Sequence, residues 1–178
     1  MVEPKAQRVS LKEIAVRFLL CAVAVLICYQ FDWNWLRFLT SESQMRLDAL
    51  LGMPHQRVAF DTILWKGTLY QYVTACTFVD VWCGAIPLMW NLRRKVWANI
   101  ARALVLALVL FVFNVVRLSF SNVLFSAGLN WDLAHNAVGG VCYFGVWVWL
   151  WNHAGWKGHA EDENVSWNAQ PELSSAAD

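Results

Sequence analysis

The sequence predicts an all-α integral membrane protein with four transmembrane helices and a small outer amphipathic or hairpin segment between the first two helices. Composition is the first reason, since 58% of the 178 residues are hydrophobic and 15% are charged, whereas a soluble domain carries about 25% charged residues. The second reason is that four apolar segments approach the ~20 residues that a helix needs to cross the hydrocarbon core. The length suits one membrane-embedded domain over residues 1–155, followed by a disordered cytoplasmic tail over 156–178.

Composition also argues against several functional classes. The net charge is +1, and the longest basic run is "RRK" at 93–95, so nothing indicates a nucleic-acid partner. The five cysteines have no metal-ligand spacing, and Cys76 and Cys83 would lie about 10 Å apart on one helix, beyond disulfide reach. There is no Gly-rich phosphate loop and no His/Glu cluster. We therefore expect neither a cofactor nor a metal.

The first of the four predicted spans covers residues 14–29. Its basic start resembles that of a signal peptide, but residues 29–35 offer no small-residue cleavage site, so we interpret it as a retained span. The others cover residues 73–90, 100–120 and 134–151.

The segment between the first two spans, residues 31–72, is too long for a simple turn. "SESQ" at 41–44 resembles a capping box, and the apolar residues that follow it, through Leu51, predict a short helix on the bilayer surface. Residues 57–72 have a strand-like pattern, with Lys66-Gly67 as a turn, which predicts a small outer hairpin.

The distribution of positive charge predicts the orientation. With the N-terminus inside, the cytoplasmic side holds nine Lys and Arg and the outer side four, in agreement with the positive-inside rule. The inner residues are Lys5, Arg8, Lys12, Arg17, Arg93, Arg94, Lys95, Arg102 and Lys157, and the outer residues are Arg37, Arg46, Arg57 and Lys66. Both termini should therefore be cytoplasmic.

This topology brings three polar residues from distant parts of the sequence to one depth. Cys76 opens the second span, Arg117 lies near the outer end of the third and His135 opens the fourth. An arginine within a span is costly and usually faces the bundle interior with a function. Asn114, three residues earlier on the same helical face, could hold the guanidinium or a substrate backbone group. We expect a site at the outer membrane interface.

These residue types suit acyl transfer from a peptide bond. A thiol attacks as the thiolate, which a neighbouring cation favours. His135 could take the proton from Cys76 and return it to the leaving amine, while Arg117 could stabilise the thiolate or the oxyanion. Asp80 lies one turn deeper and could pair with Arg117, so that neither charge is unpaired in the membrane. Asp132 could orient the imidazole or simply cap a helix.

Each residue also has an ordinary structural interpretation. Cysteine packs as a small hydrophobe, an arginine can extend its side chain to the interface, and a histidine can anchor a helix end. His55, in the outer segment, is a less favoured base. The alternative function is a non-catalytic four-helix scaffold or transporter subunit with an Asp80/Arg117 pair. A thiol–quinone oxidoreductase would need a close cysteine pair, which the sequence lacks.

Three motifs in order resemble a known family. "ACT" at 75–77, "NVVR" at 114–117 and His135 are similar to the alanine-cysteine-serine-glycine, asparagine-x-x-arginine and histidine motifs of the exosortase and archaeosortase family of membrane cysteine enzymes. The resemblance covers residues 52–150 and implies Cys76 as nucleophile, Arg117 as essential cation and His135 as general acid/base.

The resemblance further implies a function. Such enzymes act at the extracytoplasmic face of the cell (inner or plasma) membrane on exported proteins with a C-terminal sorting signal: a motif, a transmembrane helix and a basic cluster. Cleavage after the motif would be followed by transfer to a lipid or glycan acceptor or to water. This chain departs from the family pattern at Thr77, which keeps the serine hydroxyl, at Phe78, which replaces glycine, and at Asp80.

Overall fold

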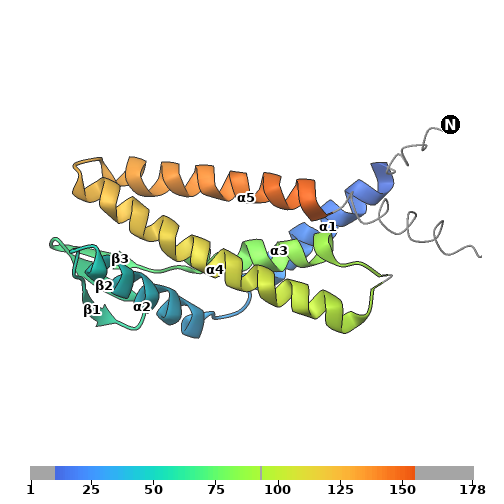
Figure 1. The fold of residues 1–178 in the computed structure, drawn as a ribbon, viewed down its shortest axis with the longest axis horizontal. Coiled ribbons are helices and arrows are strands. Elements are labelled where there is room, and N and C mark those ends of the chain that lie inside the picture. The colour runs from blue at the N-terminus through green and yellow to red at the C-terminus, as the bar shows by residue number, and fades with distance from the viewer. Residues whose placement is uncertain (1–10, 93, 155–178) are drawn as a thin grey trace, which may run out of the picture.

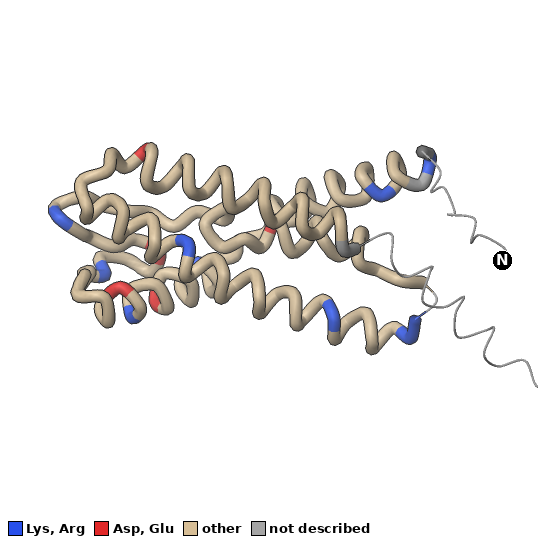
Figure 2. Tube along the Cα trace, turned by 45° about the horizontal axis from the view of Figure 1, so that its top comes forward, with Lys and Arg blue, Asp and Glu red and all other residues tan. Residues whose placement is uncertain are grey.

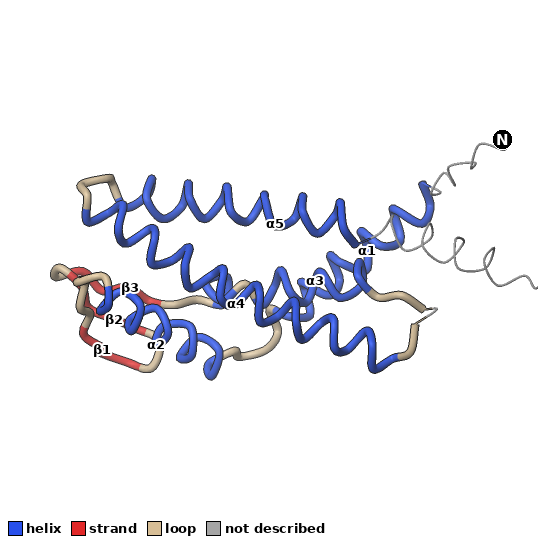
Figure 3. The backbone as a smooth tube through the Cα atoms, in the orientation of Figure 1, coloured by secondary structure: helices blue, strands red, loops and turns tan. Residues whose placement is uncertain are grey.

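The computed structural model describes residues 11–92 and 94–154, and the predicted tail at 156–178 lies outside them (Figure 1). The elements in chain order are α1 (Leu11–Cys28), α2 (Asn34–Leu50), β1 (Gln56–Ala59), β2 (Thr62–Trp65), β3 (Thr68–Gln71), the 3-10 turn η1 (Thr74–Thr77), α3 (Val79–Met89), α4 (Val96–Ser126), the π-helical turn η2 (Asp132–Ala137) and α5 (Val138–Ala154). The molecule is elongated, with α2 and the strands beside one half of α4, and α1 and α3 beside the other half (Figures 1 and 3).

The all-α prediction is confirmed only in part: most of the described chain is helical, but the outer segment, where a hairpin was predicted, contains an antiparallel three-stranded sheet in the order β1-β2-β3. The predicted turn is confirmed: Trp65 pairs with Thr68 across Lys66 and Gly67. Both turn residues have positive φ, 48° and 77°, the conformation of a tight hairpin turn that matches the strand twist. β1 adds a further strand, pairing Gln56 with Leu64. We refer to α2 and this sheet together, residues 34–71, as the cap.

The helix of the outer segment differs from the predicted surface helix. It begins at Asn34, so "SESQ" lies inside it and caps nothing. Its apolar end is exposed, with Leu50 at 85%, while its buried residues are all polar. Three of them have hydrogen-bond partners beyond α2: Ser41 accepts from Arg57, Gln44 from Tyr72 and Asp48 from Asn122. Most of this polar face is buried because residues outside α2 supply partners for it, whereas the Thr40 hydroxyl has none among the described residues.

The predicted second span, residues 73–90, is interrupted. Residues 74–77 form η1, Phe78 adopts the left-handed conformation, and α3 is only 11 residues long, or about 16 Å. This helix packs along α1 as a closely associated pair. Within the described residues, two helices are long and apolar enough to cross a membrane, 96–126 and 132–152, while the apolar parts of α1 and α3 are shorter. The prediction of four spans is therefore confirmed only in part, for the two long helices.

Apolar side chains form both the interior and the outside of the helical bundle. Its core contains Phe78, Val81, Ala85, Leu106, Leu110 and Leu150. The outer faces of α4 and α5 are also apolar, with Val105 63% exposed and Phe144 72% exposed. An apolar outer face on a long helix is typical of a membrane environment. Figure 2 shows that charged residues gather at the two ends of the molecule, mixed in sign around the cap and basic near the N-terminus.

Candidate active site

The structure brings the three predicted catalytic residues to one cavity. It has a volume of about 630 Å³ and is lined by Cys76 from η1, Arg117 from α4 and His135 from η2, together with Asp80 from α3. A second cavity, of about 300 Å³, lies towards the cap and also reaches Cys76 and His135. The thiol therefore stands between two spaces, one bordered by the helices and one by the cap.

The backbone around the thiol has an unusual conformation. Cys76 ends a turn in which its N–H donates to the carbonyl of Val73 at 2.9 Å. Two residues later, Phe78 has φ of 57°, a left-handed conformation that is strained for an aromatic residue and tends to occur at functional sites. Glycine, which stands here in the resembled motif, adopts it freely. Phe78 is 2% exposed, so packing in the core offsets the strain.

Asn114 connects η1, which carries the predicted nucleophile Cys76, to the predicted essential cation, Arg117. Its Nδ2 donates to the carbonyl oxygen of Cys76 at 2.6 Å. Its Oδ1 accepts from Nε and Nη2 of Arg117 at 3.3 and 3.1 Å. The three-residue spacing places both side chains on one face of α4. One buried amide thus fixes the guanidinium relative to the cysteine backbone, as expected for a residue that holds Arg117.

Arg117 is 7% exposed and extends between Phe78 and α5. Its guanidinium carbon lies 5.1 Å from the centre of the Phe78 ring, within the range of cation–π attraction. Gly139 gives it room, because a Cβ there would lie 2.8 Å from Nη1 of Arg117. A glycine at this position of α5 is therefore what allows the cation to occupy the cavity.

The hypothesised ion pair between Asp80 and Arg117 is not formed. Asp80 instead accepts hydrogen bonds from the hydroxyls of Tyr29, at 2.9 Å, and Tyr143, at 2.5 Å, and from the N–H of Val81. Neutral donors thus satisfy the carboxylate, while Asn114 and Phe78 hold the guanidinium. Both charges border the cavity without meeting.

His135 lies in the π-helical turn at the start of the last helix. Such turns are rare in proteins, and those that do occur are often found at functional sites. The imidazole stacks on Trp131, with centroids 4.7 Å apart and planes 9° from parallel. Asp132 does not orient it: its carboxylate accepts from Asn136 at 3.4 Å. Stacking, rather than a carboxylate, sets the orientation of the imidazole among the described residues.

The resting thiol is held in its neutral form. Burial raises the pKa of Cys76, and this effect outweighs the hydrogen bond with Val73 and the positive charges of Arg117 and Arg37, which lower it. Because a neutral thiol is a poor nucleophile, a reaction of Cys76 as a nucleophile would require a base to remove the proton. His135 is the histidine that shares both cavities with Cys76.

His55, the less favoured base, lies elsewhere. Its side chain is fully buried, with Nε2 3.5 Å from the Asp48 carboxylate. The same carboxylate accepts from Asn122 at 2.8 Å and Gln44 at 3.3 Å. His55 lines neither cavity that contains Cys76, so it belongs to the interior of the cap.

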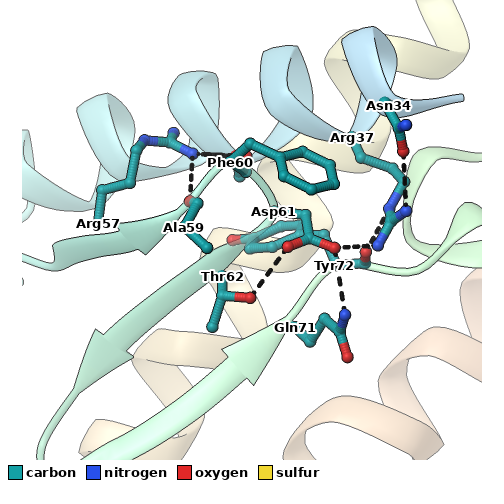
Figure 4. Close-up of polar contacts among 10 residues, drawn as sticks. Asn34, Arg37, Arg57, Ala59, Phe60, Asp61, Thr62, Gln71 and Tyr72 are labelled. Atoms are coloured by element: carbon teal, nitrogen blue, oxygen red, sulfur yellow. Dashed lines mark hydrogen bonds and ion pairs between the residues drawn. The ribbon is translucent and has the colours of Figure 1, made fainter.

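Arg37 is a residue near the site that sequence reasoning missed, having counted it only as an outer charge. Its Nε donates to the carbonyl of Tyr72 at 2.6 Å, and its Nη2 forms an ion pair with Asp61 (Figure 4). The N–H of Tyr72 also donates to the carbonyl of Asp61 at 2.7 Å. These contacts fix the backbone at Tyr72, four residues before Cys76. No spacing in the sequence connects Arg37 to Tyr72.

Comparisons with family models, with curated proteins and with solved structures found no match to this chain.

Proposed function

We propose that this chain is a membrane-embedded cysteine protease or transpeptidase that cleaves the C-terminal sorting signals of exported proteins. The observation that supports it best is the cavity of about 630 Å³ that Cys76, Arg117 and His135 line together from three distant segments. Nucleophile, base and cation in one cavity are the components that acyl transfer from a peptide requires. The resemblance to the exosortase and archaeosortase motifs points to the same three residues.

The mechanism follows from the state of the thiol. His135 takes the proton from Cys76. The thiolate then attacks the carbonyl carbon of the last residue of the recognition motif. Arg117 stabilises the negative charge on the carbonyl oxygen. The C–N bond breaks, the leaving amine takes the proton from His135, and the motif remains on Cys76 as a thioester. Water or an acceptor then releases it.

We further propose a multi-pass protein of the inner or plasma membrane with its site on the extracytoplasmic face. The two helices long enough to span support membrane association. The basic charges at the end near the N-terminus, against mixed charges around the cap, support an inward N-terminus (Figure 2). A substrate helix in the same bilayer would then present its motif near the level of Cys76.

The deciding experiment compares wild type with Cys76→Ala and Cys76→Ser in the native host. Proteins with a C-terminal helix and basic cluster are followed by gel and intact mass. We expect uncleaved precursors to accumulate in both variants, since neither alanine nor serine supplies a thiolate. If both strains process every such protein normally, Cys76 is not the nucleophile and the proposal is wrong.

A matched pair on α5 tests the role of Arg117 without changing a charged residue. Gly139→Ala would place a Cβ 2.8 Å from Nη1 of Arg117, whereas a Cβ at Gly145, which lines neither cavity that contains Cys76, meets nothing within 4 Å. Because the guanidinium is the flexible partner, it should move. We expect Gly139→Ala to slow processing by about 100-fold, the order of effect when a charge-stabilising donor is lost. Gly145→Ala should process as wild type does.

The alternative, a scaffold or transporter subunit with an Asp80/Arg117 pair, has lost its main support because the two side chains have separate partners.

A further inference from the structure

Asp80 borders the 630 Å³ cavity, and its carboxyl group has only neutral hydrogen-bond partners. Asp80 is 2% exposed and accepts from two phenol hydroxyls and one backbone N–H. Among the described residues, no Lys, Arg or His nitrogen lies within ion-pair distance of it, while four other pairs of this kind do form. A buried carboxylate without a cation is costly in low dielectric. The site is therefore suited to receive a cation.

The walls around this carboxylate are aromatic. Tyr29, Phe78, Tyr143, Phe144 and Trp147 line the same cavity. Phe78 and Tyr143 meet edge to face, with centroids 5.4 Å apart. Aromatic faces attract ammonium groups, and the attraction strengthens when the cation is desolvated. A carboxylate inside an aromatic enclosure is a recognisable arrangement for an ammonium.

This end of the cavity reaches the surface of the helical bundle. Tyr29 is 48% exposed and Phe144 is 72% exposed. The other polar residues that line the cavity include Cys76 and His135. An amine that entered past these rings would share one space with the thiol and with the base. Arg117, on the same cavity, would repel an ammonium from its own end and favour the Asp80 end.

We propose that Asp80 and the surrounding aromatic rings bind a primary ammonium, and that this amine is the acceptor in the transfer reaction. This inference rests on the proposed function for its second half only, since binding does not require catalysis. The amine is supplied either by the headgroup of an aminolipid or by a small free amine. Asp80 would be a binding residue that selects the acceptor over water.

The transfer step balances without another reactant. The bound ammonium loses one proton to neutral His135 and becomes an amine. Its nitrogen attacks the thioester carbonyl carbon, a C–N bond forms, and the C–S bond breaks to release the Cys76 thiolate. The nitrogen gives its second proton to this thiolate, and His135 later releases its proton to water. The products are an amide-linked protein and the resting thiol.

Binding is tested on the full chain in detergent by titration calorimetry. The probes are dihexanoyl phosphatidylethanolamine and n-butylamine, with dihexanoyl phosphatidylglycerol as the lipid without an amine. We expect the phosphatidylethanolamine to bind at least tenfold more tightly than the phosphatidylglycerol. Asp80→Asn should remove this preference, whereas Asp132→Asn, which changes a carboxylate outside both cavities, should keep it. Asp80→Asn keeps a side chain of the same shape and can still accept from both tyrosines.

Each outcome decides a separate point. If n-butylamine binds as well as the lipid and depends equally on Asp80, the source is a free amine; if only the lipid binds, the source is the headgroup. Equal affinity of wild type for the two lipids overturns the inference, and this comparison needs no folded variant. Undiminished binding by a folded Asp80→Asn protein also overturns it.

Product analysis separates this inference from the proposed function. In the native host, Asp80→Asn should lower the share of amine adduct among the cleaved products and raise the share that ends in a free carboxylate, by intact mass. An unchanged adduct in Asp80→Asn would overturn the acceptor role alone. Normal processing in Cys76→Ala would overturn the transfer chemistry, while amine binding, measured on Cys76→Ala protein, could still hold.

Discussion

Helix α2 of the cap and helix α3 of the bundle bury opposite kinds of side chain. The buried residues of α2 are Thr40, Ser41, Gln44 and Asp48. The buried residues of α3 are apolar apart from Asp80. A buried polar group is costly unless it finds a partner, whereas apolar side chains pack with few directional demands. The two helices are thus held in place by different interactions.

This difference teaches where a polar residue carries information. In α3 a charged side chain is an exception, and Asp80 borders the candidate site. Among the buried polar residues of α4, Arg117 borders the site and Asn114 supports it. In α2, buried polar residues such as Asp48 are the rule and connect the helix to its neighbours. Five predictions test this contrast, from the largest expected effect to the smallest.

The largest effect is expected from Asp48→Ala in the cap. The substitution leaves Gln44, Asn122 and His55 without the carboxylate that they share. Because each buried group left unpaired costs about 1–3 kcal/mol, the free energy of unfolding should fall by about 3 kcal/mol or more. Denaturant unfolding in detergent measures it. Asp48→Asn, which keeps an acceptor, should lose less, and equal losses would contradict the network.

A packing change in the bundle comes next. A Cβ at Gly84 would lie 2.7 Å from Cη2 of Trp147 and 2.9 Å from Cγ2 of Val25. Overpacking of this kind costs about 1–3 kcal/mol, so Gly84→Ala should lower the melting temperature. Gly145→Ala, where a Cβ meets nothing within 4 Å, is the control. If the two variants melt together, the contact of α3 with α1 and α5 is looser than described.

The pH dependence of Cys76 probes the boundary between the two regions. Because burial raises its pKa, alkylation by N-ethylmaleimide should continue to accelerate above the ordinary thiol pKa of ~8.5. Arg117→Gln removes a charge that opposes this shift, so the rate at pH 8 should fall by about tenfold if the pKa rises by about one unit. Peptide mass spectrometry isolates Cys76 from the other cysteines. An unchanged rate would show that the guanidinium does not act on the thiol.

The raised pKa of Cys76 also affects the free energy of unfolding. A raised pKa in the folded protein means that the neutral thiol stabilises the fold at pH values below the ordinary thiol pKa. This contribution is lost as pH rises through the folded value. The unfolding free energy should therefore decline in alkaline solution, and less so in Cys76→Ala.

The smallest effect is expected at the surface of the cap. Arg46 forms an ion pair with Glu42 at 2.8 Å, but its side chain is 78% exposed. Exposed pairs contribute about 0.2–1 kcal/mol, so Arg46→Ala should change the unfolding free energy by about 0.5 kcal/mol or less. Arg57, whose side chain is 23% exposed and which also binds Glu42, is the matched comparison. Arg57→Ala should cost more.

Hydropathy predicted the long helices and the hairpin turn well. The segments expected at 100–120 and 134–151 lie inside the helices at 96–126 and 132–152, because a long apolar run has few alternatives to a helix. The turn at Lys66 and Gly67 was also expected, since glycine favours positive φ there. The position of a residue along its predicted span gives its expected depth in the membrane. This depth was enough to predict that Cys76, Arg117 and His135 line one cavity.

Other features depend on partners that no local pattern reveals. The break at Phe78 lies inside an apolar run, and hydropathy is insensitive to backbone conformation. The polar face of α2 resembles a solvated surface, because its partners are distant in sequence. Asp80 was expected to pair with Arg117. Instead it accepts hydrogen bonds from Tyr143 of α5 and from Tyr29, which directly follows α1. Each error concerns a tertiary contact.

The uninterrupted length of α4 has a mechanical consequence. Its 31 residues extend about 46 Å, more than the ~30 Å of the hydrocarbon core, and the helix carries Arg117 as well as contacts to the cap. A continuous helix has no hinge along its axis, so the height of the guanidinium above the bilayer midplane is set by counting turns. Under the proposed function, this fixed height would determine how far from the membrane a bound chain is cut.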